Sequence, residues 1–146
     1  DACAAGSEYS GSTCELCSPG YFSPAEDSAC VPCPAGTFAS GQGSSACTSA
    51  PPGSHVLEAG QSEAQLCSPG YASGDIGSES CSACAKGVYS DEEGATECVW
   101  CSKGTYADSS AATSCIACPA GETTAHVAST SVSKCICEEG SYRSSA

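Results

Sequence analysis

The stretch Cys84-Ala-Lys-Gly87-Val-Tyr89 returns seventeen residues later as Cys101-Ser-Lys-Gly104-Thr-Tyr106. The same phrase, a Cys, a Gly three places on and usually an aromatic residue two further on, aligns nine segments of the chain. The segments begin at Cys3, Cys17, Cys33, Ala50, Cys67, Cys84, Cys101, Cys118 and Cys137, with spacings of 14, 16, 17, 17, 17, 17, 17 and 19 residues. A regular period of this length indicates stacked repeats rather than one globule.

Composition indicates how such repeats are held together. Leu, Ile, Val and Phe supply only 14 of the 146 residues, which is too few to build an apolar core, whereas 15 residues are Cys. Cross-links replace missing apolar burial in small secreted scaffolds, and they persist in oxidising compartments. We therefore predict a small disulfide-rich fold: a linear array of short β-hairpin and turn units of about 17 residues, with minimal helix and no single hydrophobic core. The predicted location is extracellular, as a secreted or cell-surface protein.

Charge and hydropathy limit the partners. Seventeen acidic residues against four basic ones give a net charge of −13, which disfavours nucleic acid and anionic membrane surfaces. No apolar run is long enough for a membrane span in this segment. Asn is absent, so N-glycans are excluded here, while Ser and Thr leave O-glycosylation open. The partners that remain are protein, through self-assembly or an extracellular partner, and carbohydrate.

Each repeat is expected to form one tight loop. The Gly three places after the opening Cys can take the positive φ that a turn requires, and the following pair with its aromatic residue favours a short strand. A return rich in Gly, Ser and Asp, such as residues 40–45, then turns the chain back. Helical periodicity is not evident anywhere.

The repeats divide the chain into four segments. Residues 1–49 hold the first three cysteine-rich repeats, residues 50–66 a degenerate repeat that lacks its bridge, and residues 67–136 four further repeats. Residues 137–146 begin another repeat and stop before a closing Cys. We therefore expect this sequence to be a window of a longer array.

The degenerate repeat bears on the disulfide pairing, because Ala50 and Ala64 stand where two cysteines are expected. If each bridge joins the opening Cys of a repeat to the Cys just before the next repeat, these two positions are the ends of one lost bridge. A rival, crossed scheme joins cysteines of neighbouring C-x-x-C pairs, for example Cys14 to Cys30, and leaves Cys3 without a partner. Connectivity cannot in general be read from sequence, and we prefer the first scheme. Its pairs are Cys3–Cys14, Cys17–Cys30, Cys33–Cys47, Cys67–Cys81, Cys84–Cys98, Cys101–Cys115 and Cys118–Cys135, with Cys137 left over.

Two consequences follow for packing and stability. The segment from Pro51 to Gln65 is predicted to be the least constrained, because a bridged loop of this size is worth ~3 kcal/mol on the entropic account. Apolar residues between the bridges and the aromatic residues of the repeats are predicted to pack one repeat on the next. The first set is Leu16, Val31, Leu66, Val99, Trp100, Ile116 and Ile136, and the second is Phe22, Phe38, Tyr89, Tyr106 and Tyr142.

Zinc binding and redox catalysis are the two alternatives to a purely structural role for the cysteines. Paired dyads such as Cys14/Cys17 with Cys30/Cys33 match zinc-ribbon spacing, but the dyads run on as a continuous chain, which favours disulfides. Redox catalysis by C-x-x-C needs a thiolate at a helix N-terminus, and no such helix is expected. We therefore predict no metal and no cofactor.

The remaining polar residues give no catalytic constellation. His55 and His126 lie in different repeats and are interpreted as solvated loop residues. The acidic run Asp91 to Glu93 with Glu97 lacks the alternating spacing of a calcium loop and is interpreted as a solvated face. Trp100, the single Trp, either covers the junction between repeats or contacts a partner or a sugar.

The segments Cys33-Pro-Ala-Gly-Thr-Phe38, Cys101-Ser-Lys-Gly-Thr-Tyr106 and Cys115-Ile-Ala-Cys-Pro-Ala-Gly121 strongly resemble the ephrin-receptor-like cysteine-rich repeats, with their phrase C-x-x-C-P-x-G-x-[YF]. The likeness covers essentially the whole chain, and Ala50, Ala64 and Thr123 depart from it. The opening loop of tumour-necrosis-factor-receptor modules is similar and implies the bridge from Cys17 to Cys30. Protist cysteine-rich surface proteins are similar as well.

The resemblance implies extracellular spacers, adhesion stalks or receptor ectodomains without catalysis. We predict a non-enzymatic structural repeat segment of a longer surface or fibrous protein, such as a filament subunit of a flagellar hair or cell-surface fibre. The alternative is a ligand-binding receptor ectodomain or adhesion stalk, in which Trp100 and the irregular fourth repeat form the partner site.

Overall fold

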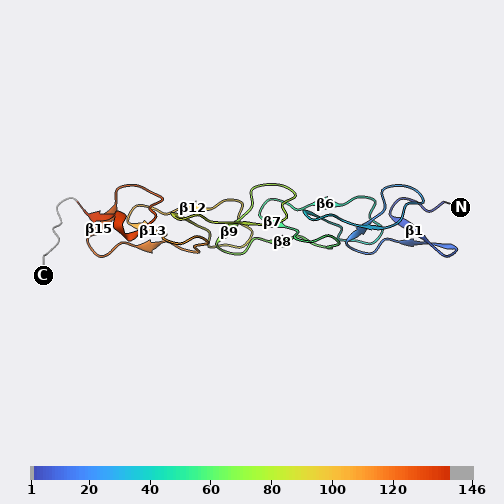
Figure 1. The fold of residues 1–146 in the computed structure, drawn as a ribbon, viewed down its shortest axis with the longest axis horizontal. Helices are drawn as coiled ribbons and strands as arrows, with labels where there is room; N and C mark the ends of the chain where they lie inside the picture. Colours follow the sequence, from blue (N-terminus) through green and yellow to red (C-terminus); the bar gives the residue numbers. More distant parts are fainter. Residues whose placement is uncertain (1, 139–146) are drawn as a thin grey trace. The chain divides into compact units, whose positions relative to one another are not determined.

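The computed structural model describes residues 2–138, which form eight antiparallel two-stranded sheets (Figure 1). Each sheet is a hairpin of consecutive strands: β1 (Ser7–Ser10) with β2 (Thr13–Leu16), β3 (Tyr21–Phe22) with β4 (Val31–Pro32), β5 (Thr37–Phe38) with β6 (Thr48–Ser49), β7 (Ser54–His55) with β8 (Gln65–Leu66), β9 (Tyr71–Ala72) with β10 (Ser82–Ala83), β11 (Val88–Tyr89) with β12 (Val99–Trp100), β13 (Thr105–Tyr106) with β14 (Ile116–Ala117), and β15 (Glu122–Thr124) with β16 (Cys135–Cys137). Within these residues the one helical element is the 3-10 turn η1 (Val132–Lys134). The predicted class of small, disulfide-rich hairpin repeats with minimal helix is confirmed.

The glycine that follows each opening Cys behaves as predicted. In all eight complete repeats its φ is positive, between +77° and +88°. At Gly87, for example, φ is +88° and a Cβ atom would meet the backbone carbonyl of Ala128, two repeats further along. Only a residue without a side chain fits both the left-handed conformation and this close approach of two backbones. The motif glycine therefore fixes a turn and a packing distance together.

Neighbouring repeats are joined by backbone hydrogen bonds in a recurring pattern. In the first bond, the amide of the motif Gly donates to a carbonyl of the next repeat, that of the residue three places after its motif Gly. In the second, the amide three places after the first motif Gly donates to a carbonyl in the loop of the next repeat. In the third, an amide of that loop donates back to the carbonyl of the opening residue of the first repeat.

All three bonds of the pattern are present between the second and third, third and fourth, fourth and fifth, and sixth and seventh repeats, and two of them at the other junctions. Between the second and third repeats the bonds are Gly20 N to Ala39 O (2.8 Å), Ser23 N to Ser44 O (3.1 Å) and Gly43 N to Cys17 O (2.8 Å). Between the sixth and seventh repeats they are Gly87 N to Ala107 O (2.9 Å), Ser90 N to Ala112 O (3.1 Å) and Ala111 N to Cys84 O (2.7 Å).

The buried residues are small, and they follow the same pattern. Two positions of each repeat are buried almost throughout: the opening Cys and the residue three places after the motif Gly. The second position is occupied by Ser23, Ala39, Val56, Ser73, Ser90, Ala107 and Thr124. Because backbones approach directly there, only small or β-branched side chains fit between them. Covalent bridges and backbone hydrogen bonds take the place of a core.

The apolar spacers are not buried between repeats, although the Leu16 side chain does lie against Gly43 of the third repeat. The side chains expected to pack one repeat on the next are exposed, from 42% at Val31 to 68% at Trp100. Leu16, Leu66, Val99, Ile116 and Ile136 fall between these values. They lie on the return strand of a hairpin, that is, on its second strand. The inter-repeat hydrogen bonds form a backbone ladder in which the backbones are too close together to leave space for a large side chain. The aromatic residues Phe22, Phe38, Tyr89 and Tyr106 are half-buried, and Tyr142 lies outside the described residues.

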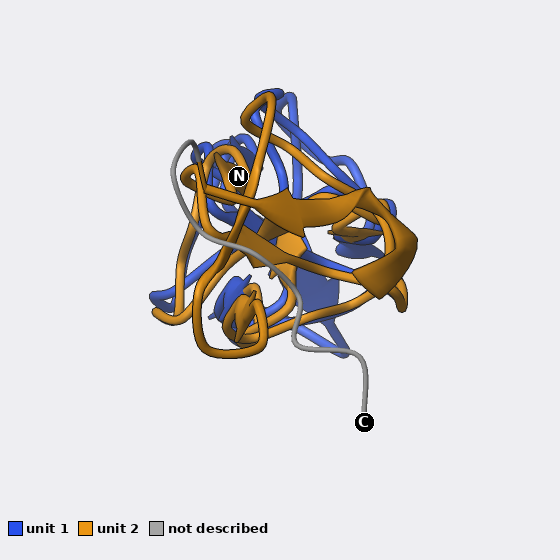
Figure 2. Ribbon diagram, turned by 90° about the vertical axis from the view of Figure 1, so that its left-hand side faces the viewer, with its two compact units in different colours: residues 1–66, 73–81 blue, residues 67–72, 82–146 orange. Residues whose placement is uncertain are grey.

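The chain separates into two compact units, coloured in Figure 2. The first comprises residues 1–66 and 73–81, and the second residues 67–72 and 82–146. Each contains the same hairpins and the same inter-repeat hydrogen bonds. Among the residues described, none of the helical structure is long and apolar enough to cross a membrane.

The fourth repeat keeps the architecture although it lacks its two cysteines. Ala50 is fully buried, as Cys33 is, and its amide still donates to the Gly36 carbonyl at 2.9 Å. The repeat also makes the full set of three bonds to the fifth: Gly53 N to Ser73 O (2.6 Å), Val56 N to Ser78 O (3.0 Å) and Gly77 N to Ala50 O (2.8 Å). The backbone ladder therefore does not require the bridge in order to form.

Candidate functional site

The disulfides are the dominant chemical feature of the described chain, and they close loops within repeats. The bridges are Cys3–Cys14, Cys17–Cys30, Cys33–Cys47, Cys84–Cys98, Cys101–Cys115 and Cys118–Cys135, and Cys67 and Cys81 are disulfide-bonded as well. Their Cα–Cα distances of 5.5–5.8 Å are ordinary for a disulfide. These are within-repeat bridges, and the crossed scheme is not the one the structure contains. Cys137 is half-buried and free.

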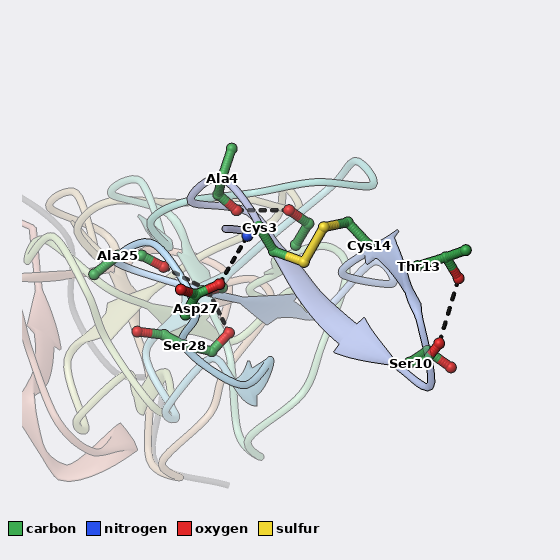
Figure 3. Close-up of a disulfide and its surroundings, with 10 residues drawn as sticks. Cys3, Ala4, Ser10, Thr13, Cys14, Ala25, Asp27 and Ser28 are labelled. Carbon is green, nitrogen blue, oxygen red and sulfur yellow. Dashed lines mark hydrogen bonds between the residues drawn. A yellow bond between two sulfur atoms is a disulfide. The ribbon is translucent and has the colours of Figure 1, made fainter. Parts of the chain in front are cut away.

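Figure 3 shows how the first bridge is anchored. The Cys3 amide donates to the Asp27 carboxylate at 2.7 Å, and the Asp27 amide donates back to the Cys3 carbonyl at 2.9 Å. Glu8 accepts a bond from the Cys30 amide at 2.9 Å in the same region. Two carboxylates therefore satisfy backbone donors here, which gives part of the acidic charge a structural role.

The oxidised cysteines bear directly on the zinc and redox interpretations. Cys14 and Cys17 are bonded to Cys3 and Cys30, so neither sulfur is the thiolate that binds zinc or attacks a disulfide. His55 Nδ1 lies 3.3 Å from Cys81 Sγ, but that sulfur is also oxidised. A neutral disulfide sulfur lacks the charge that makes Cys a strong ligand.

The other polar candidates have simple surroundings. The backbone carbonyl of His126 accepts hydrogen bonds from Thr124 Oγ1 (2.9 Å) and Ser129 Oγ (3.0 Å). Asp91, Glu92 and Glu93 are exposed to solvent, and so is Glu97. Their arrangement is that of a solvated acidic face.

Among the aromatic side chains of residues 2–138, Trp100 is the most exposed, with 68% of its surface accessible. It lies on β12, and its Cα pairs with that of Val88 on β11. The corresponding positions of the repeats before and after it in sequence are Ala83 and Ala117, the second residues of β10 and β14. The indole therefore stands where these two repeats carry Ala and the fourth carries Leu66, and it projects into solvent instead of covering a junction between repeats.

Sequence reasoning missed a second left-handed position, seven places after the motif Gly. Gly43, Gly60, Gly77 and Gly94 occupy it with φ between +73° and +80°, and their amides donate to the opening position of the preceding repeat. Asp27, Ala111 and Ala128 occupy the same position with φ of +55° to +58°. The recurring Gly at this spacing is the signal that could have identified it.

Together, the laddered hairpins and within-repeat bridges define a class of extracellular-type cysteine-rich repeat modules. A family model described as "tyrosine-protein kinase ephrin type A/B receptor-like" matches residues 20–67, 70–114 and 87–135. The chain therefore belongs to the ephrin-receptor-like cysteine-rich repeat family. No curated protein is a significant match to the chain. Its repeats are non-catalytic modules, and these together with the many disulfides suggest an extracellular location.

Proposed function

We propose that this segment has an architectural role, as part of a longer surface or fibrous protein that assembles into a filament such as a flagellar hair or cell-surface fibre. The observation that supports the proposal most strongly is the repeated backbone ladder. Two or three backbone hydrogen bonds between neighbouring repeats, and a bridge within nearly every repeat, resist bending and unravelling without a core. A chain held in this way transmits force through covalent links and backbone bonds.

The exposed apolar side chains supply a surface for association. Leu16 (63% exposed), Leu66 (58%) and Ile116 (47%) lie on the return strands of the first, fourth and seventh hairpins. Burial of one such side chain between two chains contributes roughly 1.5–3 kcal/mol. The net charge of −13 opposes close approach, and this repulsion is screened over about 10 Å at 0.1 M salt. Assembly is therefore expected to strengthen as salt is raised.

Electron microscopy of the purified protein at rising salt tests the proposal. The expected result is ordered fibres in the natural chain and their loss in a variant with Leu16, Leu66 and Ile116 replaced by Ser. Because these side chains are exposed, the variant should keep its thermal unfolding midpoint and its disulfides, which separates assembly from folding. A monodisperse monomer at every salt concentration would contradict the proposal.

The alternative is a ligand-binding receptor ectodomain, and the exposure of Trp100 is the observation that favours it. The other element of that hypothesis, an irregular fourth repeat, has lost its basis because this repeat forms the same hairpin and ladder as its neighbours. Capture of one soluble extracellular protein by a monomeric chain, lost on Trp100→Ala, would favour the receptor.

A further inference from the structure

We infer that Trp100 and its surroundings form a binding site for a neutral oligosaccharide chain. The inference is independent of filament assembly, because it rests on two adjacent repeats, the sixth and the seventh, within the second compact unit. Its starting point is the position of the indole between two surface hollows. The smaller is lined by Glu97, Cys98, Val99 and Trp100. The larger is lined by residues that include Tyr89, Asp91, Trp100, Thr113 and Ser114.

The lining of the larger hollow is rich in groups that bond to sugar hydroxyls. Asp91, Thr113 and Ser114 are exposed, and Tyr89 is half-buried. Their side chains make no hydrogen bond within the described part of the chain, so they are open to a ligand. Thr105, in the same lining, is instead held by a bond from its Oγ1 to the Ser102 carbonyl (2.8 Å). Hydroxyls and one carboxylate therefore surround a flat aromatic surface.

This combination matches the two faces of a pyranose ring. The C–H groups of a sugar ring form an apolar face that stacks on an indole, while the hydroxyls at its edge need donors and acceptors. Tyr89 Oη, Thr113 Oγ1 and Ser114 Oγ can both donate and accept, and the Asp91 carboxylate accepts strong bonds. Because the two hollows share Val99 and Trp100, a linear chain lying across the indole would reach both.

Charge determines which sugars fit. Neither hollow is lined by Lys or Arg, while Asp91 and Glu97 contribute negative charge in a chain of net charge −13. Uronic acids, sulfated sugars and nucleic acid are therefore disfavoured, and neutral hexose chains are not. A peptide anchor would need an apolar pocket, whereas the larger hollow combines the apolar surfaces of Val99 and Trp100 with polar side chains such as Asp91.

Trp100 also provides the assay, since it is the only Trp among 146 residues. Its fluorescence is followed while the protein is titrated with maltohexaose, cellohexaose, mannohexaose and galactohexaose, and with hexagalacturonate as the acidic comparison. We expect a saturable change in emission with at least one neutral hexasaccharide and none with hexagalacturonate. Saturation-transfer NMR measures the same binding in variants that lack the fluorophore.

Three variants distinguish stacking of the sugar on Trp100 from non-specific binding. Trp100→Ala should weaken binding about tenfold or more, and Thr113→Val, which removes a hydroxyl and keeps the shape, about three- to tenfold. Leu66→Ala changes the corresponding exposed residue of the fourth repeat and should leave binding unchanged. The inference is overturned if no neutral hexasaccharide binds or if Trp100→Ala binds equally well. It is overturned too if emission responds only to protein concentration, because the indole would then contact another protein surface.

Discussion

The sharpest prediction concerns the fourth repeat, in which Ala50 and Ala64 replace the two cysteines of a bridge. Cys33–Cys47, Cys84–Cys98 and Cys101–Cys115 all span 14 residues, as Ala50 and Ala64 do. A bridge over such a loop is worth ~3 kcal/mol, because it removes conformational freedom from the opened chain. The hydrogen bonds of the fourth repeat are otherwise complete, so the missing bridge is the principal difference from its neighbours.

Amide hydrogen exchange reports this difference residue by residue. The Gly53 and Val56 amides correspond to those of Gly87 and Ser90 in the bridged sixth repeat, and all four donate to the repeat that follows. A difference of ~3 kcal/mol in local opening corresponds to roughly 100-fold in exchange rate. We expect Gly53 and Val56 to exchange faster than Gly87 and Ser90 by about this factor.

The matched variant is Ala50→Cys with Ala64→Cys, which restores the bridge. Thiol titration should still find only Cys137 reduced, and exchange at Gly53 and Val56 should slow to the rate of the sixth repeat. Equal exchange in the natural fourth and sixth repeats, or a bridged variant that exchanges as fast as the natural chain, would refute the reasoning. The hydrogen bonds alone would then account for local stability.

Three further pairs of substitutions test the inter-repeat hydrogen bonds through the thermal unfolding midpoint. Gly87→Ala should destabilise the protein well beyond Gly104→Ala. Both glycines have positive φ, and an Ala in that conformation costs about 1–2 kcal/mol at either position. Only the new Cβ at Gly87 meets a backbone carbonyl, whereas at Gly104 the nearest atom to the new Cβ is Thr123 Oγ1 at 3.6 Å. Equal losses would show that the close approach is unimportant. Ala111→Gly should stabilise the protein by about 0.5–1 kcal/mol, because φ is +58° at that position. Ala107→Gly, at a buried position of ordinary φ, should destabilise the protein by a similar amount. If both variants shift the midpoint in the same direction, backbone conformation does not determine their effect. Asp27→Ala should cost about 2 kcal/mol, since it removes the acceptor of the Cys3 amide and leaves Ala at φ +55°, whereas Asp27→Asn keeps an acceptor and should cost less than half as much. Similar effects of the two Asp27 variants would count against the hydrogen bond.

Much of the local structure could be predicted from the repeat phrase. The Cys-x-x-Gly motif specifies a turn, because Gly is the residue that takes positive φ without strain, and all eight complete repeats have it. The joint loss at Ala50 and Ala64 indicated bridges within repeats, which is the pairing the structure contains. Both inferences use information within one repeat.

Contacts between repeats could not be predicted in the same way. A period shows that repeats are equivalent, but it does not show which backbone atoms of one meet the next. The sequence therefore predicts contacts between repeats through large apolar residues such as Leu16, whereas the small residues Ser23 and Ser90 are the ones buried there and Leu16 is exposed. The consistent small residue three places after the motif Gly was visible in the sequence, but its meaning depends on the direct approach of two backbones.

The central claim is that bridges laid within successive repeats hold this chain in place of a core. Peptide mapping of the native protein by mass spectrometry without reduction tests it most directly. The account predicts linked peptides that contain Cys17 with Cys30, Cys84 with Cys98 and Cys101 with Cys115. Peptides that link Cys14 to Cys30 or Cys17 to Cys33, or free thiols at these positions in the folded protein, would contradict it.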